Sequence, residues 1–157
     1  MPCVQSQVVV NAPLPRVWEL AKDSENFPSI MEDVDAVHIL EQEAISDTVT
    51  RVVSEWHGRI AAFNRKVKWI EEEFWNQTDY TCTFKQLKGD FTDYSGLWSF
   101  KPTDAGVLID LSIEYLFEVP MIGPLINKVV LKLMKNNCDN MLTALKTEAE
   151  RTSAFEH

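Results

Sequence analysis

The longest hydrophobic pattern in the chain lies in its last third, from Met121 to Ala149. Apolar residues recur there at intervals of three and four, the spacing that places side chains on one face of an α-helix. Proline near the start suits the first helical turn, where a backbone N–H has no partner to lose. The pattern predicts one long amphipathic helix whose apolar face needs a cover. The stripe consists of Ile126, Val129, Val130, Leu133, Met134, Asn137, Met141, Leu142 and Leu145.

The segments before this helix predict mostly β-strands, because β-branched and aromatic residues alternate with polar ones between short turns. Two short helices are expected after the first strand, over Leu14–Lys22 and around Phe27, and a turn is expected at His57-Gly58. The short connections favour antiparallel pairing, so we expect an α+β fold in which a curved antiparallel sheet wraps around one C-terminal helix. Seven strands are predicted, over Cys3–Val10, Val34–Leu40, Asp47–Trp56, Arg59–Glu72, Tyr80–Leu87, Thr92–Lys101 and Val107–Val119.

Alternation within the strands predicts which side chains face the helix, because successive residues point to opposite faces of a sheet. The predicted inner face is aromatic and aliphatic, with Arg65 as its one charged member in the fourth strand. Apolar walls with a few polar groups are typical of a small-molecule pocket, although a core rich in aromatic residues has the same composition. The inner aromatic residues are Phe63, Trp69, Tyr80, Phe84, Tyr94, Trp98, Phe100, Tyr115 and Phe117.

Composition narrows the class of protein. The chain has 157 residues, of which 45% are hydrophobic, and a formal net charge of −9. This length predicts a single domain over residues 1–157 with a sizeable core. The acidic balance argues against nucleic acid or an anionic membrane as the main partner, because both repel negative charge.

The sequence contains no motif that is typical of a metal or cofactor site. The three histidines have no metal-ligand spacing, no serine lies in a G-x-S-x-G setting, and no glycine-rich phosphate loop is present. We therefore expect neither a metal nor a cofactor. The acidic run Glu71-Glu72-Glu73 is interpreted as a solvated strand end.

Cysteine usage and hydropathy predict the compartment. Cys3, Cys82 and Cys138 are odd in number and form no CxxC pair, which suits a reducing environment. No apolar run approaches the roughly 20 residues that span a bilayer, and the first residues lack the pattern of a signal peptide. We expect a cytoplasmic protein without an integral membrane segment.

Several short motifs together resemble the polyketide cyclase/dehydrase group of the START-like (SRPBCC) superfamily over nearly the whole chain. The resemblance implies the helix-grip, Bet v 1-like fold and a hydrophobic ligand. The superfamily includes aromatase/cyclases, coenzyme Q-binding proteins, and carriers of lipids or steroids, so the fold alone leaves the function open. The motifs are Val9–Pro13 with Val17-Trp18, Phe27-Pro28, Val37–Glu41, Lys88–Phe91 with Gly96–Trp98, Val119–Leu125 and Asn140-Met141.

The resemblance also implies roles for individual residues. Arg65 corresponds to an arginine proposed to hold a substrate carbonyl in aromatase/cyclases, and Asn140 to an asparagine that faces their cavity. From the predicted inner face rather than from the resemblance, a tyrosine, with Tyr94 as the candidate, or an ordered water would shuttle protons. A buried guanidinium needs a partner, so Arg65 contacts a ligand, pairs with an inward-reaching acid, or reaches water where the strand edge twists. The expected ligand-binding residues are Phe27, Trp56, Phe63, Tyr80, Phe84, Phe91, Trp98, Tyr115, Asn137 and Met141.

Three hypotheses about the function follow. The first is an aromatase/cyclase-like enzyme that folds a poly-β-keto chain and promotes aldol cyclisation and dehydration, with an acyl carrier protein as a candidate partner. The alternative is a non-catalytic carrier of a lipid, an isoprenoid quinone or a sterol-like molecule. A third hypothesis, in which side chains fill the interior, also fits the aromatic content. The sequence leaves the ligand and the oligomeric state open, and the total resemblance favours the cyclase.

Overall fold

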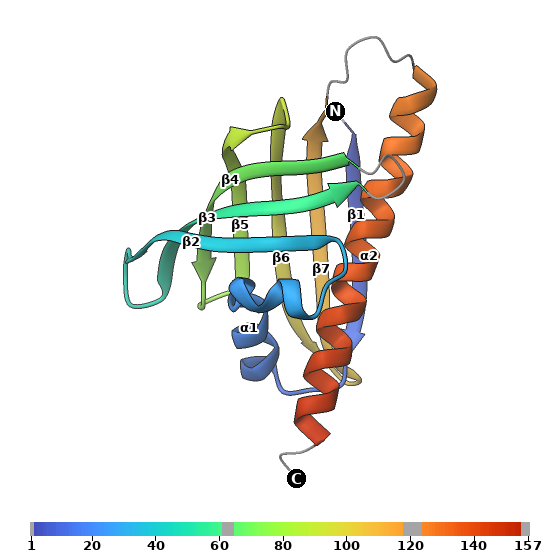
Figure 1. The fold of residues 1–157 in the computed structure, drawn as a ribbon. Coiled ribbons are helices and arrows are strands. Elements are labelled where there is room, and N and C mark those ends of the chain that lie inside the picture. The colour runs from blue at the N-terminus through green and yellow to red at the C-terminus, as the bar shows by residue number, and fades with distance from the viewer. Residues whose placement is uncertain (1, 61–64, 118–123, 155–157) are drawn as a thin grey trace.

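The computed structural model describes the backbone of residues 2–60, 65–117 and 124–154, and their side chains except at residues 60, 65, 124–126 and 152–154. Seven antiparallel strands form one sheet in the order β1-β7-β6-β5-β4-β3-β2. The sheet curves around a long helix (Figure 1), which confirms the predicted helix-grip architecture. The strands are β1 (Cys3–Val10), β2 (Val34–Ala44), β3 (Val49–Ile60), β4 (Arg65–Asn76), β5 (Thr81–Gly89), β6 (Asp93–Thr103) and β7 (Gly106–Leu116).

The long helix, α2 (Pro124–Ala154), lies along the concave side of the sheet and packs beside β1 (Figure 1). The predicted helix is confirmed, although it continues five residues beyond Ala149, and residues 121–123 lie outside the described part of the chain. Val129 is 38% exposed, so the buried stripe is rotated from the predicted one and takes in Cys138. Its buried members are Val130, Met134, Cys138, Leu142, Leu145 and Ala149.

Two short helices follow β1, as the sequence predicts. The first, α1 (Leu14–Lys22), has the predicted bounds, and the second is a 3₁₀ helix, η1 (Ser24–Ser29). Trp18 of α1 makes edge-to-face contacts with Trp75, Tyr80 and Phe100 at centroid distances of 5.1 to 5.3 Å. This cluster fixes α1 against the sheet. No helix in the described residues is long and apolar enough to cross a membrane.

The predicted turn at His57-Gly58 is wrong, because both residues lie inside β3. Gly58 pairs with Val34 on one side and with Val67 on the other. A Cβ atom at this glycine would lie 3.3 Å from the carbonyl oxygen of Asp33. Glycine is therefore used here for the close approach of the chain just before β2, and not for a turn.

Candidate functional site

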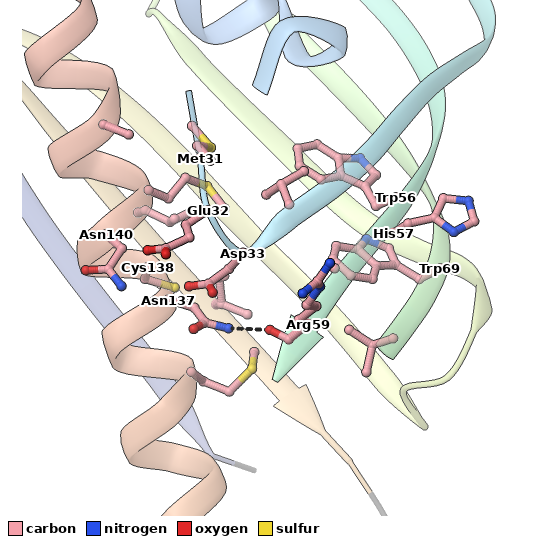
Figure 2. A pocket seen from close by; sticks show the side chains of 18 of the residues that line it. Met31, Glu32, Asp33, Trp56, His57, Arg59, Trp69, Asn137, Cys138 and Asn140 are labelled. Carbon is pink, nitrogen blue, oxygen red and sulfur yellow. Dashed lines mark hydrogen bonds between the residues drawn. The ribbon is translucent and has the colours of Figure 1, made fainter. Parts of the chain in front are cut away.

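A cavity of about 320 Å³ lies between the sheet and α2. Figure 2 shows it between the helix, which carries Asn137, Cys138 and Asn140, and the strands that carry Trp56 and Trp69. The lining comes from the segment between η1 and β2, from the inner faces of β3 to β7, and from the middle of α2. The helix-grip fold thus leaves space at the centre of the molecule for a small organic molecule.

The walls of the cavity are flat and aromatic. The indole rings of Trp56 and Trp69 stack with an interplanar angle of 7° at a centroid distance of 5.8 Å. Tyr94 stacks on Phe91 at 4.7 Å and lies 5.2 Å from Trp69. Phe84 packs against Tyr94 at 5.7 Å. Such walls favour planar or conjugated ligands, because ring faces pack well on one another.

One end of the cavity is polar and partly exposed. The side-chain nitrogen of Asn137 on α2 donates to the carbonyl oxygen of Arg59 at 3.3 Å, a bond that crosses from the helix to the end of β3 (Figure 2). The backbone nitrogen of Arg59 donates to the carbonyl oxygen of Asp33 at 3.0 Å. The Arg59 guanidinium pairs with Asp35, which raises the pKa of this guanidinium. Asn140, one helical turn after Asn137, is exposed on the same side.

The deep part of the site holds two carboxyl groups, on Glu71 and Glu73 of β4. Their exposed fractions are 5% and 3%, so the interpretation of this run as solvated is wrong for both. Glu71 lines the cavity, and it accepts a hydrogen bond from Trp69 Nε1 at 2.7 Å. Glu73 accepts hydrogen bonds from Ser54 Oγ at 2.7 Å and from Trp75 Nε1 at 2.9 Å.

The surroundings of Glu71 favour its protonated form. Burial raises the pKa of Glu71 well above its usual value, and the neighbouring charge of Glu73 and a hydrogen bond between the two carboxyls raise it further. Burial and the nearby Glu71 raise the pKa of the Tyr94 hydroxyl in turn. Burial also raises the pKa of the Cys138 thiol to about 12. The cavity therefore presents a carboxylic acid, a phenol and a thiol in their protonated forms.

Many of the residues predicted from the sequence come together at this cavity. Periodic patterns identified the inward positions of Phe84, Tyr94 and Trp98 on the strands and of Asn137 and Met141 on α2, whereas Asn140 was expected from the family resemblance. Phe91 follows β5 and lies on no strand. The predicted residues that line the cavity are Trp56, Phe84, Phe91, Tyr94, Trp98, Asn137, Asn140 and Met141.

Phe27, Tyr80 and Tyr115 lie elsewhere in the core. Phe27 packs against Trp56 at 5.7 Å and does not line the cavity. Tyr80 is not in a strand, because it adopts a left-handed backbone conformation (φ 53°) just before β5 and packs on Trp18. Tyr115 is buried within β7, and its hydroxyl has no hydrogen-bond partner among the described residues.

Two further predicted residues, Phe63 and Arg65, follow the end of β3. Phe63 lies outside the described residues. Arg65 is the first residue of β4 and pairs with Ile60, but its side chain is outside the described part, so its inward placement stays a prediction. The ring of His57 is turned away from the cavity (Figure 2) and hydrogen-bonds to Glu55 at 2.8 Å.

The fold and the cavity define a START-like helix-grip protein. Residues 1–150 match the family described as polyketide cyclase/dehydrase and lipid transport, and the chain belongs to this family.

Solved structures of other proteins are similar over nearly the whole chain. A protein from Thermus thermophilus is 32% identical, with a TM-score of 0.87 and coverage of 97% of this chain and 99% of that one. The Zhui aromatase/cyclase from Streptomyces sp. R1128 is 22% identical, with a TM-score of 0.82 and coverage of 95% and 93%. A STAR-related lipid transfer protein from Xanthomonas axonopodis is 16% identical, with a TM-score of 0.72 and coverage of 92% and 84%. The last two likenesses show the fold alone.

Proposed function

We propose that this protein binds a poly-β-keto chain or a related oxygenated, ring-forming molecule in its cavity and promotes aldol cyclisation and dehydration. The observation that carries the proposal is the set of polar groups in the lining of an aromatic cavity. Asn137 and Asn140 line it from the partly exposed face of α2, and the buried Glu71 and Tyr94 line it from the sheet. A poly-β-keto chain has a carbonyl on every second carbon, so it can use acceptors and donors at separated points.

The cavity walls would supply much of the rate enhancement by holding the poly-β-keto substrate in a folded shape. Bringing two reacting carbons together within one molecule can lower a barrier by several kcal/mol. The amide of Asn140 can both donate and accept, which suits a ketone and an enol. Tyr94 has a raised pKa and stays protonated, so it suits a hydrogen-bond donor to an oxygen that gains negative charge.

The role of Arg65 rests on the resemblance to aromatase/cyclases. In this proposal its guanidinium polarises the carbonyl that is attacked, or stabilises the enolate oxygen. An acyl carrier protein that delivers the chain is the candidate partner. The net charge of −9 supports a small-molecule function over binding of nucleic acid, and the cysteine usage supports a reducing compartment such as the cytoplasm.

A non-catalytic carrier is the second candidate function. The apolar character of most lining residues favours it, because a lipid, an isoprenoid quinone or a sterol-like ring needs mainly apolar contact. The structural likeness to a protein described as lipid transfer points the same way. In this case the polar groups would only hold the head of a stable ligand.

One experiment distinguishes the cyclase function from the carrier function. The wild-type protein is incubated with a poly-β-keto chain carried on an acyl carrier protein, and the products are compared by liquid chromatography and mass spectrometry with those formed without the protein. We expect one cyclised, dehydrated product to be enriched at least about 10-fold, the effect of about 1.4 kcal/mol on the competing barriers. If the product mixture is unchanged and the protein retains the uncyclised poly-β-keto molecule, the non-catalytic carrier function is favoured.

A further inference from the structure

The inner face of β4 carries two buried carboxyl groups that have no charge partner among the described side chains. Glu71 and Glu73 are 5% and 3% exposed, and neither forms a salt bridge with a described lysine, arginine or histidine. Between them in sequence, Glu72 points to the other face of the strand and pairs with Arg51 at 2.7 Å. The described side chains thus neutralise the outward carboxylate, whereas the inward ones have hydrogen bonds from neutral donors.

The elements packed around Glu71 supply no internal cation. The lysines of β4, Lys66 and Lys68, are exposed. Arg65 is six residues from Glu71 on the same strand, a separation of about 20 Å along an extended chain, which is too far for a direct ion pair. The titratable groups that face this part of the cavity are acids, a phenol and thiols: Glu73 of β4, Cys82 of β5, Tyr94 of β6 and Cys138 of α2.

The rings beside Glu71 have the composition of a site for an organic cation. Trp69 donates its indole N–H to the Glu71 carboxyl at 2.7 Å. The ring of Trp69 lies 5.2 Å from that of Tyr94 and 5.8 Å from that of Trp56, and Phe84 lies 5.7 Å from Tyr94. The faces of aromatic rings carry partial negative charge and attract ammonium groups. A carboxyl among such rings therefore provides both interactions that stabilise a cation away from water.

The partly exposed side of the lining carries charge of the same sign. Glu32 and Asp33 line the cavity from the segment before β2, and Figure 2 shows both carboxylates directed toward α2. The described lining contains no lysine, and its one arginine, Arg59, pairs with Asp35 at 3.0 Å. Together with the net charge of −9, these carboxylates favour the approach of cations over that of anions.

We propose that the cavity also binds a hydrophobic organic cation, a protonated amine whose N–H group contacts the Glu71 carboxylate and whose apolar part packs on the aromatic walls. This ligand class goes beyond the proposed function, because a poly-β-keto chain is uncharged. Burial and the charge of Glu73 raise the pKa of Glu71 in the absence of a cation. Binding of the amine therefore releases the Glu71 proton to solvent, and the carboxylate that forms is the counter-ion of the ligand.

Two probes of the same shape isolate the effect of charge. Dibenzylamine is protonated at neutral pH, and dibenzyl ether has an uncharged oxygen in place of the NH₂⁺ group. Isothermal titration calorimetry measures both affinities for wild type, Glu71→Gln and Glu114→Gln, at several pH values between about 5 and 7. Glutamine keeps the size of Glu71 and an acceptor for Trp69. Glu114 is exposed on β7, so its substitution removes the same charge away from the cavity.

The ratio of the two affinities is the readout. At neutral pH we expect wild type to bind the amine at least about 10-fold more tightly than the ether. This preference should increase with pH, by up to about 10-fold per pH unit, while Glu71 titrates. In Glu71→Gln the preference should fall by about 10-fold and no longer depend on pH, whereas Glu114→Gln should behave as wild type does.

Equal binding of the two probes by wild type overturns the inference, as does a Glu71→Gln variant that keeps the wild-type preference. If the variant does not fold, wild type alone decides, because a preference that stays constant between about pH 5 and 7 shows that no buried carboxyl titrates against the ligand. Dibenzoylmethane, a β-diketone with two flat rings, is the parallel probe of the proposed function. If it binds and the amine is not preferred over the ether, this inference alone is wrong; if none of the three probes binds, the proposed function is contradicted as well.

Discussion

Replacing Glu71 with glutamine is expected to stabilise the protein increasingly, relative to wild type, as the pH rises above about 4.5. In wild type the pKa of Glu71 is raised in the folded state from an ordinary value of 4.5. Above 4.5 the unfolded chain releases this proton while the folded protein retains it. The stability of wild type therefore falls by up to about 1.4 kcal/mol per pH unit until the pH reaches the raised folded value. Glutamine does not titrate, so the free energy of unfolding of the Glu71→Gln variant does not fall with pH in this way.

Urea denaturation followed by tryptophan fluorescence measures the effect at several pH values from about 4 upward to about 9, because the loss begins near the ordinary pKa of 4.5. Glu114→Gln is a suitable control, because Glu114 is an exposed residue of β7. Its difference from wild type should stay nearly constant over the same range. A pH-independent difference for Glu71→Gln as well would mean that Glu71 titrates alike in the folded and unfolded chains, and would contradict its raised pKa.

Replacing Ala144 with tryptophan is expected to abolish ligand binding while leaving the fold intact. Ala144 lies on α2 and lines the cavity, so a large ring at this position occupies space that a ligand needs. We expect the affinity for dibenzoylmethane to fall by more than about 100-fold, equivalent to about 2.7 kcal/mol. The stability cost should be about 1–3 kcal/mol, as is usual for overpacking.

Asn136→Trp is the matched control for this substitution. Asn136 is exposed on the same helix and does not line the cavity, so the control adds a tryptophan without filling the interior. It should bind the probe as wild type does, when both are measured by isothermal titration calorimetry. If Ala144→Trp folds and binds equally well, the ligand lies outside this cavity.

Long periodic patterns made much of the fold predictable. The helical spacing of apolar residues predicted α2, and the short amphipathic segment Leu14–Lys22 was predicted with the bounds of α1. Alternation in β6 and β7 identified the inward faces, including Tyr94 and Trp98. These patterns arise because one face of a helix or strand is buried, so many residues of the same element contribute to the pattern.

The acid pair could not be predicted from residue type. Three consecutive glutamates favour a solvated position, because an isolated buried carboxylate is costly. The alternation in β4 did contain a signal, since Glu71 and Glu73 share the parity of Trp69 and Trp75. What makes their burial possible is the set of donors around them, including Ser54 on β3. Those partners become visible only when the strands are paired.

Gly58 shows a second limit of local reasoning. Glycine after histidine predicts a turn from sequence alone, because glycine is common in turns. In the structure the same residue lies within β3 and lets the chain at Asp33 approach closely. Gly58 has no side chain that would crowd Asp33, a residue distant in the sequence. A local sequence pattern does not indicate such a long-range contact.

We propose that the cavity binds an oxygenated hydrophobic molecule against its aromatic wall, with an oxygen at Glu71. A crystal structure of the wild-type protein with dibenzoylmethane, a β-diketone with two flat rings, would locate the ligand. We expect a phenyl ring packed on the Trp56–Trp69 stack and a ligand oxygen within hydrogen-bond distance of a Glu71 carboxyl oxygen, about 2.5–3.0 Å. A ligand seated outside the cavity, or inside it with both oxygens directed away from Glu71, would show that this binding mode is wrong.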